Sequence, residues 1–115
     1  MKDIAFLGTS LDDIRDFPDD IRQDTGYQLH LVQIGEMPND FKYMNTIGSG
    51  VVEIRLKDAN GIYRVVYTAK FANVVYVLHA FTKKTQKTPQ ADLNLAKSRL
   101  NALIQHLKDN KNDDP

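Results

Sequence analysis

A hairpin turn between two strand-like runs limits the folds open to this chain more than any other local feature. Residues 51–57 alternate between apolar and charged side chains, and residues 62–71 are rich in tyrosine and valine. Alternation with a period of two is typical of a strand that has one buried face. The Asn60-Gly61 pair between the runs tolerates the positive φ angles that tight hairpin turns need. We therefore expect an antiparallel hairpin whose first strand carries its charged residues on one face and its apolar residues on the other.

Further strands and helices are expected on both sides of this hairpin. The pattern predicts strands at residues 4–7 and 74–81, helices at residues 10–17 and 18–35, a loop at 37–50, and a last helix opening at Thr88-Pro89. Thr88 suits a helix N-cap, and Pro89 suits the first helical position. The element order β-α-α-β-β-β-α defines an α+β fold. We place one domain at residues 1–108 and a polar tail at 109–115.

Two of these elements carry apolar side chains that need partners. The strand at 74–81 is apolar on both faces, as a strand covered on both sides would be. The last helix has a stripe with spacings of three and four residues, which is one face of a helix: Leu93, Ala96, Leu100, Leu103 and Leu107. This stripe packs either on the sheet or the second helix, or on a second copy or another partner.

The composition excludes several classes of protein. A chain of 115 residues suits one domain. Since it has no cysteine, a disulfide scaffold and a thiolate metal site are excluded, and a reducing cytoplasm is the expected location. The longest apolar run, 74–78, is far shorter than the roughly 18 residues of a membrane span. We expect neither a membrane segment nor a signal peptide.

The formal net charge of zero conceals a strong asymmetry along the chain. Residues 1–40 hold three basic and nine acidic residues, a net charge of −6, whereas residues 41–99 hold ten basic and three acidic residues, a net charge of +7. Residues 100–115 have a net charge of −1. A neutral protein is a poor nucleic-acid binder as a whole, but a local basic face remains possible. The alternative is that the acidic helices and the basic strands only neutralise each other.

Basic residues gather on the hairpin and after the strand at 74–81, while common catalytic motifs are missing. We find no phosphate-binding loop, no dinucleotide fingerprint and no metal-binding histidine spacing. The basic residues that stand out are Arg55, Lys57, Arg64, Lys83, Lys84 and Lys87. Because like charges repel, such a cluster implies an anionic ligand or nearby acids. A phosphate-rich ligand explains it, and the alternative is a solvated sheet face with Glu53 and Asp58 as partners.

His79 and the tyrosines leave two interpretations open. A histidine in an apolar strand is either a hydrogen-bonded core residue or a catalyst. In a regular strand His79 alternates in register with Lys83, and nearby lysines disfavour its charged form, which suits a neutral base. Tyr63, Tyr67 and Tyr76 are core or sheet-surface aromatics, although one of them could stack on an RNA base.

Several segments resemble a known family. Residues 50–55 (Gly-Val-Val-Glu-Ile-Arg), 63–67 (Tyr-Arg-Val-Val-Tyr) and 78–89 (Leu-His-Ala-Phe-Thr-Lys-Lys-Thr-Gln-Lys-Thr-Pro) are similar to the phage-derived, HigB-like branch of the RelE toxin superfamily. The resemblance extends from about Leu11 to Leu107. It implies a RelE-like single α+β domain of antiparallel hairpins, with the helices packed on one face of the sheet and a basic concave surface.

The resemblance also implies an activity and its partners. Toxins of this type II toxin–antitoxin class cleave messenger RNA, commonly on the ribosome, and the superfamily uses no metal. The implied partners are mRNA, the ribosome and a small helix-turn-helix (HigA-like) antitoxin, through which alone DNA would be reached. No cofactor and no membrane is implied. The alternative is a non-catalytic, phage-derived module of the same fold that binds RNA or protein.

Metal-free RNA cleavage assigns roles to the basic residues. The substrate's 2′-hydroxyl attacks the adjacent phosphate, which requires a base, an acid and cations around the phosphate. The catalytic candidates are Arg55, Arg64, His79, Lys83 and Lys84, and the RNA-binding candidates are Lys42, Lys57 and Lys87. The arginines suit phosphate stabilisation, and the lysines and His79 suit phosphate contact or proton transfer. Several members of the superfamily use a C-terminal tyrosine, and none follows Tyr76 here, so the acid and base stay unassigned.

Overall fold

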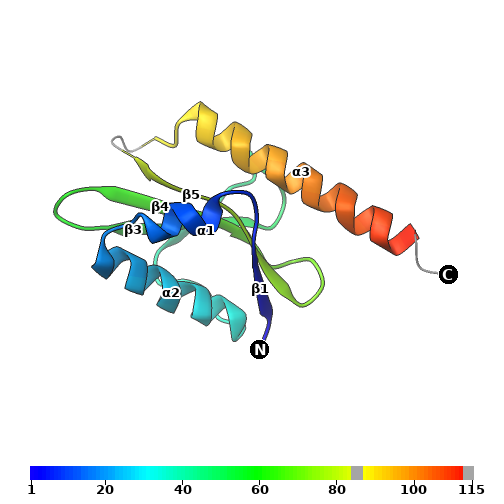
Figure 1. Ribbon diagram of the computed structural model, residues 1–115, viewed down its shortest axis with the longest axis horizontal. Helices are drawn as coiled ribbons and strands as arrows, with labels where there is room; N and C mark the ends of the chain where they lie inside the picture. The colour runs from blue at the N-terminus through cyan, green and yellow to red at the C-terminus, as the bar shows by residue number, and fades with distance from the viewer. Residues whose placement is uncertain (84–86, 113–115) are drawn as a thin grey trace.

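The predicted hairpin lies in the middle of a five-stranded sheet. The computed structural model describes residues 1–83 and 87–112. In chain order its elements are β1 (Asp3–Phe6), α1 (Ser10–Arg15), α2 (Asp19–Gln33), β2 (Phe41–Tyr43), β3 (Val51–Lys57), β4 (Ile62–Thr68), β5 (Val74–Lys83) and α3 (Gln90–Asn112) (Figure 1). The expected α+β class is confirmed. Four residues of the expected tail, 109–112, belong to α3.

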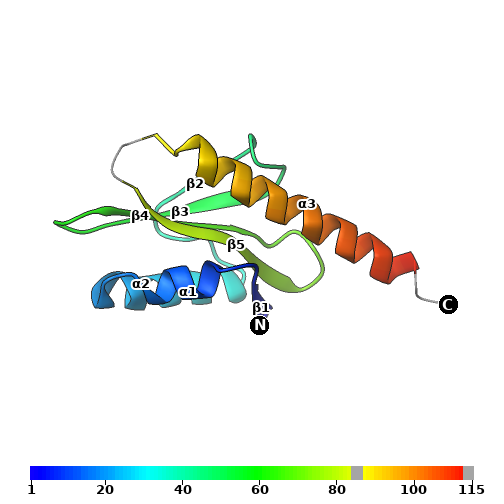
Figure 2. The same cartoon turned by 45° about the horizontal axis from the view of Figure 1, so that its top comes forward.

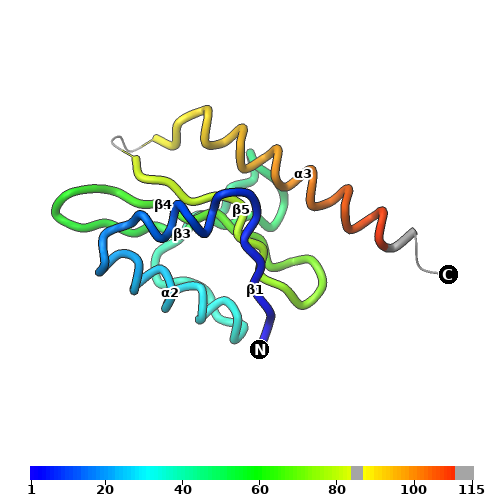
Figure 3. Tube along the Cα trace, viewed as in Figure 1, coloured from blue at the N-terminus to red at the C-terminus, as the bar shows by residue number. Residues whose placement is uncertain are grey.

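The strand order is β1-β5-β4-β3-β2, and it differs from the expectation at both edges. β2, β3, β4 and β5 pair in antiparallel fashion, whereas β1 runs parallel to β5, far from it in the sequence (Figure 3). β2 lies in the segment that we expected to be a loop. Three residues are too few to show an alternation, and this strand forms because β3 offers an edge. The β3 amide of Arg55 donates to the carbonyl of Asp40, and Met44 donates to Val51, each at 2.9 Å.

Helices cover both faces of the sheet, so the expectation that they pack on one face is wrong. α1 and α2 lie on one side and α3 on the other (Figure 2). The α1/α2-side cluster joins both helices to the sheet and includes Ile14, Phe17, Ile21, Leu29, Val52, Ile54, Leu56, Tyr63, Val65, Tyr67 and Val77. The α3-side cluster consists of Met44, Ile47, Val51, Val66, Leu78, Phe81, Ala96, Leu100 and Leu103. The physical reason is that β5 is apolar on both faces, and each face has to be removed from water.

The leucine stripe of α3 is therefore used inside the chain. Ala96, Leu100 and Leu103 are buried against the sheet, and Leu93 and Leu107 are partly buried against the same cluster. Of the two interpretations of the stripe, packing on the sheet is confirmed. Among residues 1–83 and 87–112, no helix combines the length and the apolar character that crossing a membrane requires.

Candidate functional site

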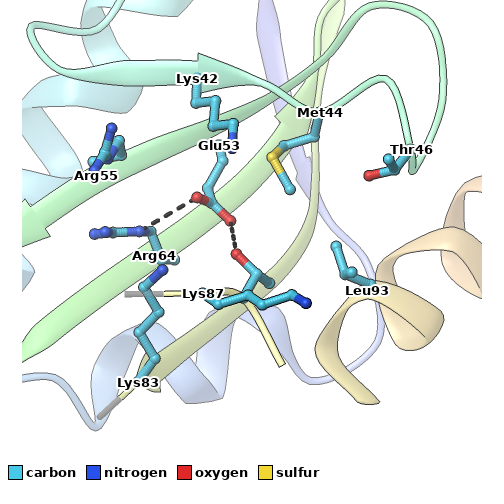
Figure 4. Close-up of a pocket in the computed structure, with 10 residues that line it drawn as sticks. Lys42, Met44, Thr46, Glu53, Arg55, Arg64, Lys83, Lys87 and Leu93 are labelled. Carbon is cyan, nitrogen blue, oxygen red and sulfur yellow. Dashed lines mark hydrogen bonds and ion pairs between the residues drawn. The ribbon is translucent and has the colours of Figure 1, made fainter. Parts of the chain in front are cut away.

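A pocket of about 230 Å³ opens on the α3 face of the sheet, beside the start of α3. Its lining consists of Lys42, Met44, Thr46, Glu53, Arg55, Arg64, Lys83, Lys87, Thr88 and Leu93 (Figure 4). Strand register explains this gathering, because Lys42 is the partner of Glu53 and Arg55 is the partner of Arg64. The expected separation of the two faces of β3 is confirmed for residues 52–57, since Val52, Ile54 and Leu56 lie in the α1/α2-side cluster while Glu53 and Arg55 line the pocket.

Most of the basic residues singled out in the sequence meet at this pocket. Arg55, Arg64, Lys83, Lys42 and Lys87 all line it. Lys57 lines a smaller neighbouring pocket of about 120 Å³, which shares Arg55 and Arg64 with the first. Lys84 lies outside the described residues. The pocket and its neighbour thus form a basic surface over β3, β4 and β5 toward the tip of the hairpin.

Glu53 lies between these cations, and the sequence analysis considered it only as a partner of the basic residues on a solvated sheet face. It is only 2% exposed, and its Oε1 lies 3.3 Å from Nε of Arg64. The hydroxyl of Thr88 donates to its Oε2 at 3.1 Å, so Thr88 contacts the sheet, and α3 begins two residues later, at Gln90. Buried carboxylates need such partners, because desolvation of an isolated charge is costly. The sequence feature that could have predicted its place in the site is its position on the charged face of β3, next to the strand that carries Arg64.

Arg64 is held in place by three groups. Its Nη1 donates to the carbonyl of Tyr63 at 3.0 Å and to that of Leu56 at 3.4 Å, in addition to the ion pair with Glu53. The Nε–Oε1 contact lacks hydrogen-bond geometry, and within the described residues Nε has no hydrogen-bond partner. The side chain is 5% exposed. The guanidinium is therefore a buried positive charge that Glu53 and, more weakly, Asp40 compensate.

The electrostatics of the pocket act most clearly on Lys83. Burial lowers the pKa of Lys83, and the neighbouring Arg64 and Arg55 lower it further, while Glu53 opposes them. Burial also lowers the pKa of Arg64, with Glu53 again opposing. An arginine stays charged even so, because its ordinary pKa is above 12. The surroundings of Lys83 thus favour its neutral amine more than water does.

His79 lies beneath α3 and is not part of the pocket lining. Its Nε2 is 2.7 Å from Oδ1 of Asp92, and its Nδ1 is 3.3 Å from Nη1 of Arg99. Because an arginine can only donate, Nδ1 accepts, and the ring proton is on Nε2, directed at Asp92. The ring stacks on Phe81 at 5.0 Å. This geometry favours the interpretation of His79 as a hydrogen-bonded core residue over that of a base.

Arg99 is a further residue that the sequence did not single out. It donates to the carbonyl of Leu78 at 2.9 Å and to Oγ1 of Thr9 at 3.1 Å, in addition to His79. Gly8 makes room for it, since a Cβ there would lie 2.5 Å from the guanidinium, and the φ of Gly8 is +55°. These contacts attach α3 to β5 and to the segment before α1, and so fix the helix that forms one wall of the pocket.

The tyrosines are structural residues. Tyr63 and Tyr67 are buried in the α1/α2-side cluster, on the other face of the sheet from the pocket, and Tyr76 is partly buried against the α3-side cluster. Within the part of the chain that the structure describes, no tyrosine lines the pocket. In the same residues, no group of three histidine, aspartate or glutamate side chains comes together as a metal site would.

Comparison with known proteins places the chain in a family. Residues 12–101 match the family described as phage-derived protein Gp49-like (DUF891). This stretch contains every residue that lines the pocket. A search of curated proteins found no match. The family match covers well over half of the 115 residues. The chain therefore belongs to the phage-derived Gp49-like family, which is related to the toxins of toxin–antitoxin systems.

Proposed function

We propose that this protein is the toxin of a type II toxin–antitoxin system and that it cleaves messenger RNA on the ribosome without a metal ion. The observation that carries the proposal is the pocket, in which five basic side chains surround one buried carboxylate. Family membership and the sequence resemblance to the HigB-like branch of the RelE superfamily support it. The partners proposed with it are mRNA, the ribosome and a helix-turn-helix antitoxin in the cytoplasm.

The proposed reaction uses the RNA's own 2′-hydroxyl as the nucleophile. Its oxygen loses its proton and forms a bond to the adjacent phosphorus while the bond to the 5′-oxygen breaks, and that oxygen takes a proton from water, leaving a 2′,3′-cyclic phosphate and a free 5′-hydroxyl. Arg55, exposed at the pocket, and the buried Arg64 stabilise the charge that builds on the phosphate oxygens. Each such donor contributes roughly a hundredfold to a thousandfold in rate.

Lys83 is the proposed proton-transfer group. Its lowered pKa makes the neutral amine more accessible than in an ordinary lysine, so it can accept the proton of the 2′-hydroxyl. Glu53 keeps Arg64 in place and is a positioning residue in this scheme. His79 has no part in the reaction, because both of its ring nitrogens are engaged beneath α3.

Presentation by the ribosome follows from the charge distribution. The chain is neutral as a whole, and the pocket and its neighbour together present six basic side chains. A few phosphate contacts give only weak, salt-sensitive binding to free RNA. The ribosome supplies the local concentration and orientation of mRNA that such a small surface does not.

A non-catalytic RNA-binding module is the second candidate function. Two observations favour it: His79 is engaged at both ring nitrogens, and no tyrosine lines the pocket in the described residues. Such a module would keep the phosphate-binding cations and lack productive proton transfer. It differs from the toxin in one measurable property, the cleavage of bound mRNA.

The deciding experiment incubates the purified protein with ribosomes programmed with mRNA and maps the 5′ ends of the products. We expect cuts with the wild type and at least a hundredfold slower cutting with Arg55→Ala, which removes an exposed cation. Lys97→Ala is the matched control, because Lys97 is exposed on α3 and does not line the pocket. Intact mRNA with the wild type would reject the nuclease and favour the binding module.

A further inference from the structure

The pocket has two chemically different ends. Arg55, Arg64 and Lys83 come from β3, β4 and β5. Met44, Thr46 and Leu93 come from the segment after β2 and the start of α3, and they lie on the other side of Glu53, where the Lys87 side chain also reaches (Figure 4). A site that bound only a phosphate would need the cationic end alone. The apolar end calls for a ligand that carries a flat or apolar group next to its anion.

The apolar end is an opening of the α3-side cluster. Met44 is a member of this cluster and Leu93 packs against it, yet both also line the open pocket. Apolar side chains that face an open pocket gain stability when a ligand removes them from water. A methionine thioether also makes favourable contacts with aromatic rings. Thr46, which is exposed, adds a hydroxyl that can donate and accept at the rim.

We propose that the Met44–Leu93 end of the pocket is a nucleobase subsite, which holds the base of a nucleotide whose phosphate lies at the cationic end. This inference rests on the proposed function for the identity of the ligand as RNA. The two side chains contact the base face, and the Thr46 hydroxyl contacts its edge. The pocket, at about 230 Å³, is smaller than the roughly 300–1,000 Å³ of sites that enclose drug-sized ligands, so it takes one unit of a longer chain.

The subsite differs from the usual way of holding unpaired bases. Single-strand binders stack bases on aromatic rings, which accept every base. The described lining of this pocket contains no aromatic side chain. Apolar side chains favour the base whose size and shape fill the slot between them. The Thr46 hydroxyl at the rim favours bases whose edge offers a matching hydrogen-bond donor or acceptor. The subsite is therefore a source of sequence preference as well as of affinity.

The test compares two probes that share a sugar and a phosphate: adenosine 5′-monophosphate, which carries a base, and ribose 5-phosphate, in which a hydroxyl takes the place of the base. Binding of each to the purified protein is measured by NMR titration. We expect the nucleotide to bind roughly threefold to tenfold tighter than ribose 5-phosphate, the gain from burying one face of a base on aliphatic side chains. Equal affinities, or no detectable binding of either probe, would overturn the subsite.

Substitutions in α3 test whether the tighter binding of the nucleotide comes from Leu93. Leu93→Ala should bring the ratio of the two affinities close to one, and Leu93→Met, which keeps an apolar side chain, should retain it. Leu95→Ala is the matched control, because Leu95 is exposed on the same helix and does not line the pocket. Arg55→Ala should weaken both probes alike. An unchanged ratio in Leu93→Ala, with its thermal melting point unaltered, would refute the assignment.

This experiment separates the subsite from the nuclease proposal. A protein that discriminates between the probes but leaves ribosome-bound mRNA intact has the subsite and is a binding module. A protein that cuts mRNA but binds both probes equally is a nuclease without the subsite. In an active protein, Thr46→Val should also change which positions of one mRNA are cut, whereas Leu95→Ala should leave the cut positions the same.

Discussion

Replacing Glu53 by glutamine tests whether one buried carboxylate holds the pocket together. Glutamine has nearly the same shape, and its carbonyl can still accept the Thr88 hydroxyl. It leaves Arg64, whose side chain is 5% exposed, without the carboxylate that lies against it. Removing one partner of a buried ion pair costs about 3–5 kcal/mol. Arg64 keeps two carbonyl acceptors, so we expect the lower end of this range, about 3 kcal/mol.

This cost translates into a measurable shift in melting temperature. With an unfolding entropy of about 2.1 cal/mol/K per residue, a chain of 115 residues loses roughly 12 °C for a 3 kcal/mol destabilisation. Thermal unfolding followed by circular dichroism measures it directly. Asp12→Asn is the matched control, because it removes the same charge from an exposed pair at 3.9 Å and should cost under about 1 kcal/mol.

Glu53→Gln should also change the pH dependence of the cleavage rate, which a purely structural role of Glu53 would not do. Glu53 raises the pKa of Lys83, so its loss should lower that pKa further. If neutral Lys83 accepts the proton, the rising limb of cleavage rate against pH shifts to lower pH in Glu53→Gln. A melting temperature within about 3 °C of the wild type would refute the claim that this pair stabilises the pocket. An unshifted pH limb in a cleaving variant would refute the link between Glu53 and Lys83.

Three further outcomes are expected. The pKa of Lys83 is lowered in the folded protein, so the unfolded chain binds more protons between that pKa and the ordinary value of 10.5. The free energy of unfolding therefore rises with pH across this window. In urea unfolding, Lys83→Met should lose this rise and show equal or greater stability at neutral pH. Leu100→Ala, at 4% exposure, should cost about 2–5 kcal/mol in the same assay, against less than about 1 kcal/mol for the exposed Leu95→Ala. Binding to free single-stranded RNA should weaken as salt rises, and Lys57→Ala should reduce the slope of log affinity against log salt by about one; an unchanged slope would remove Lys57 from the RNA surface.

The arrangement of the helices shows where local sequence patterns stop being informative. The period of three and four in α3 predicts its buried stripe, and the two apolar faces of β5 predict that it is covered twice. Neither pattern says which helix covers which face. Which helix covers which face depends on contacts between segments that are distant in sequence, such as the pairing of β1 with β5. The short strand β2 depends in the same way on the edge that β3 presents.

Local sequence patterns likewise predict some features of the site and not others. Alternation along β3 and the hairpin turn suffice to bring Arg55 and Arg64 together, because residues that face each other across a short hairpin follow from the turn. The sequence likewise places Lys83 at the end of the next strand. It does not reveal that Glu53 is buried between them or that His79 is engaged by Asp92 and Arg99.

Period and turn chemistry act through the backbone of a few neighbouring residues, and they settle the strands, the hairpin and the charged face of β3. Burial, charge compensation and proton affinity depend on everything that surrounds a side chain. The burial of Glu53 and Lys83 and the contacts of His79 are therefore decided by the tertiary structure, in which α3 packs on the sheet and leaves a pocket beside its start.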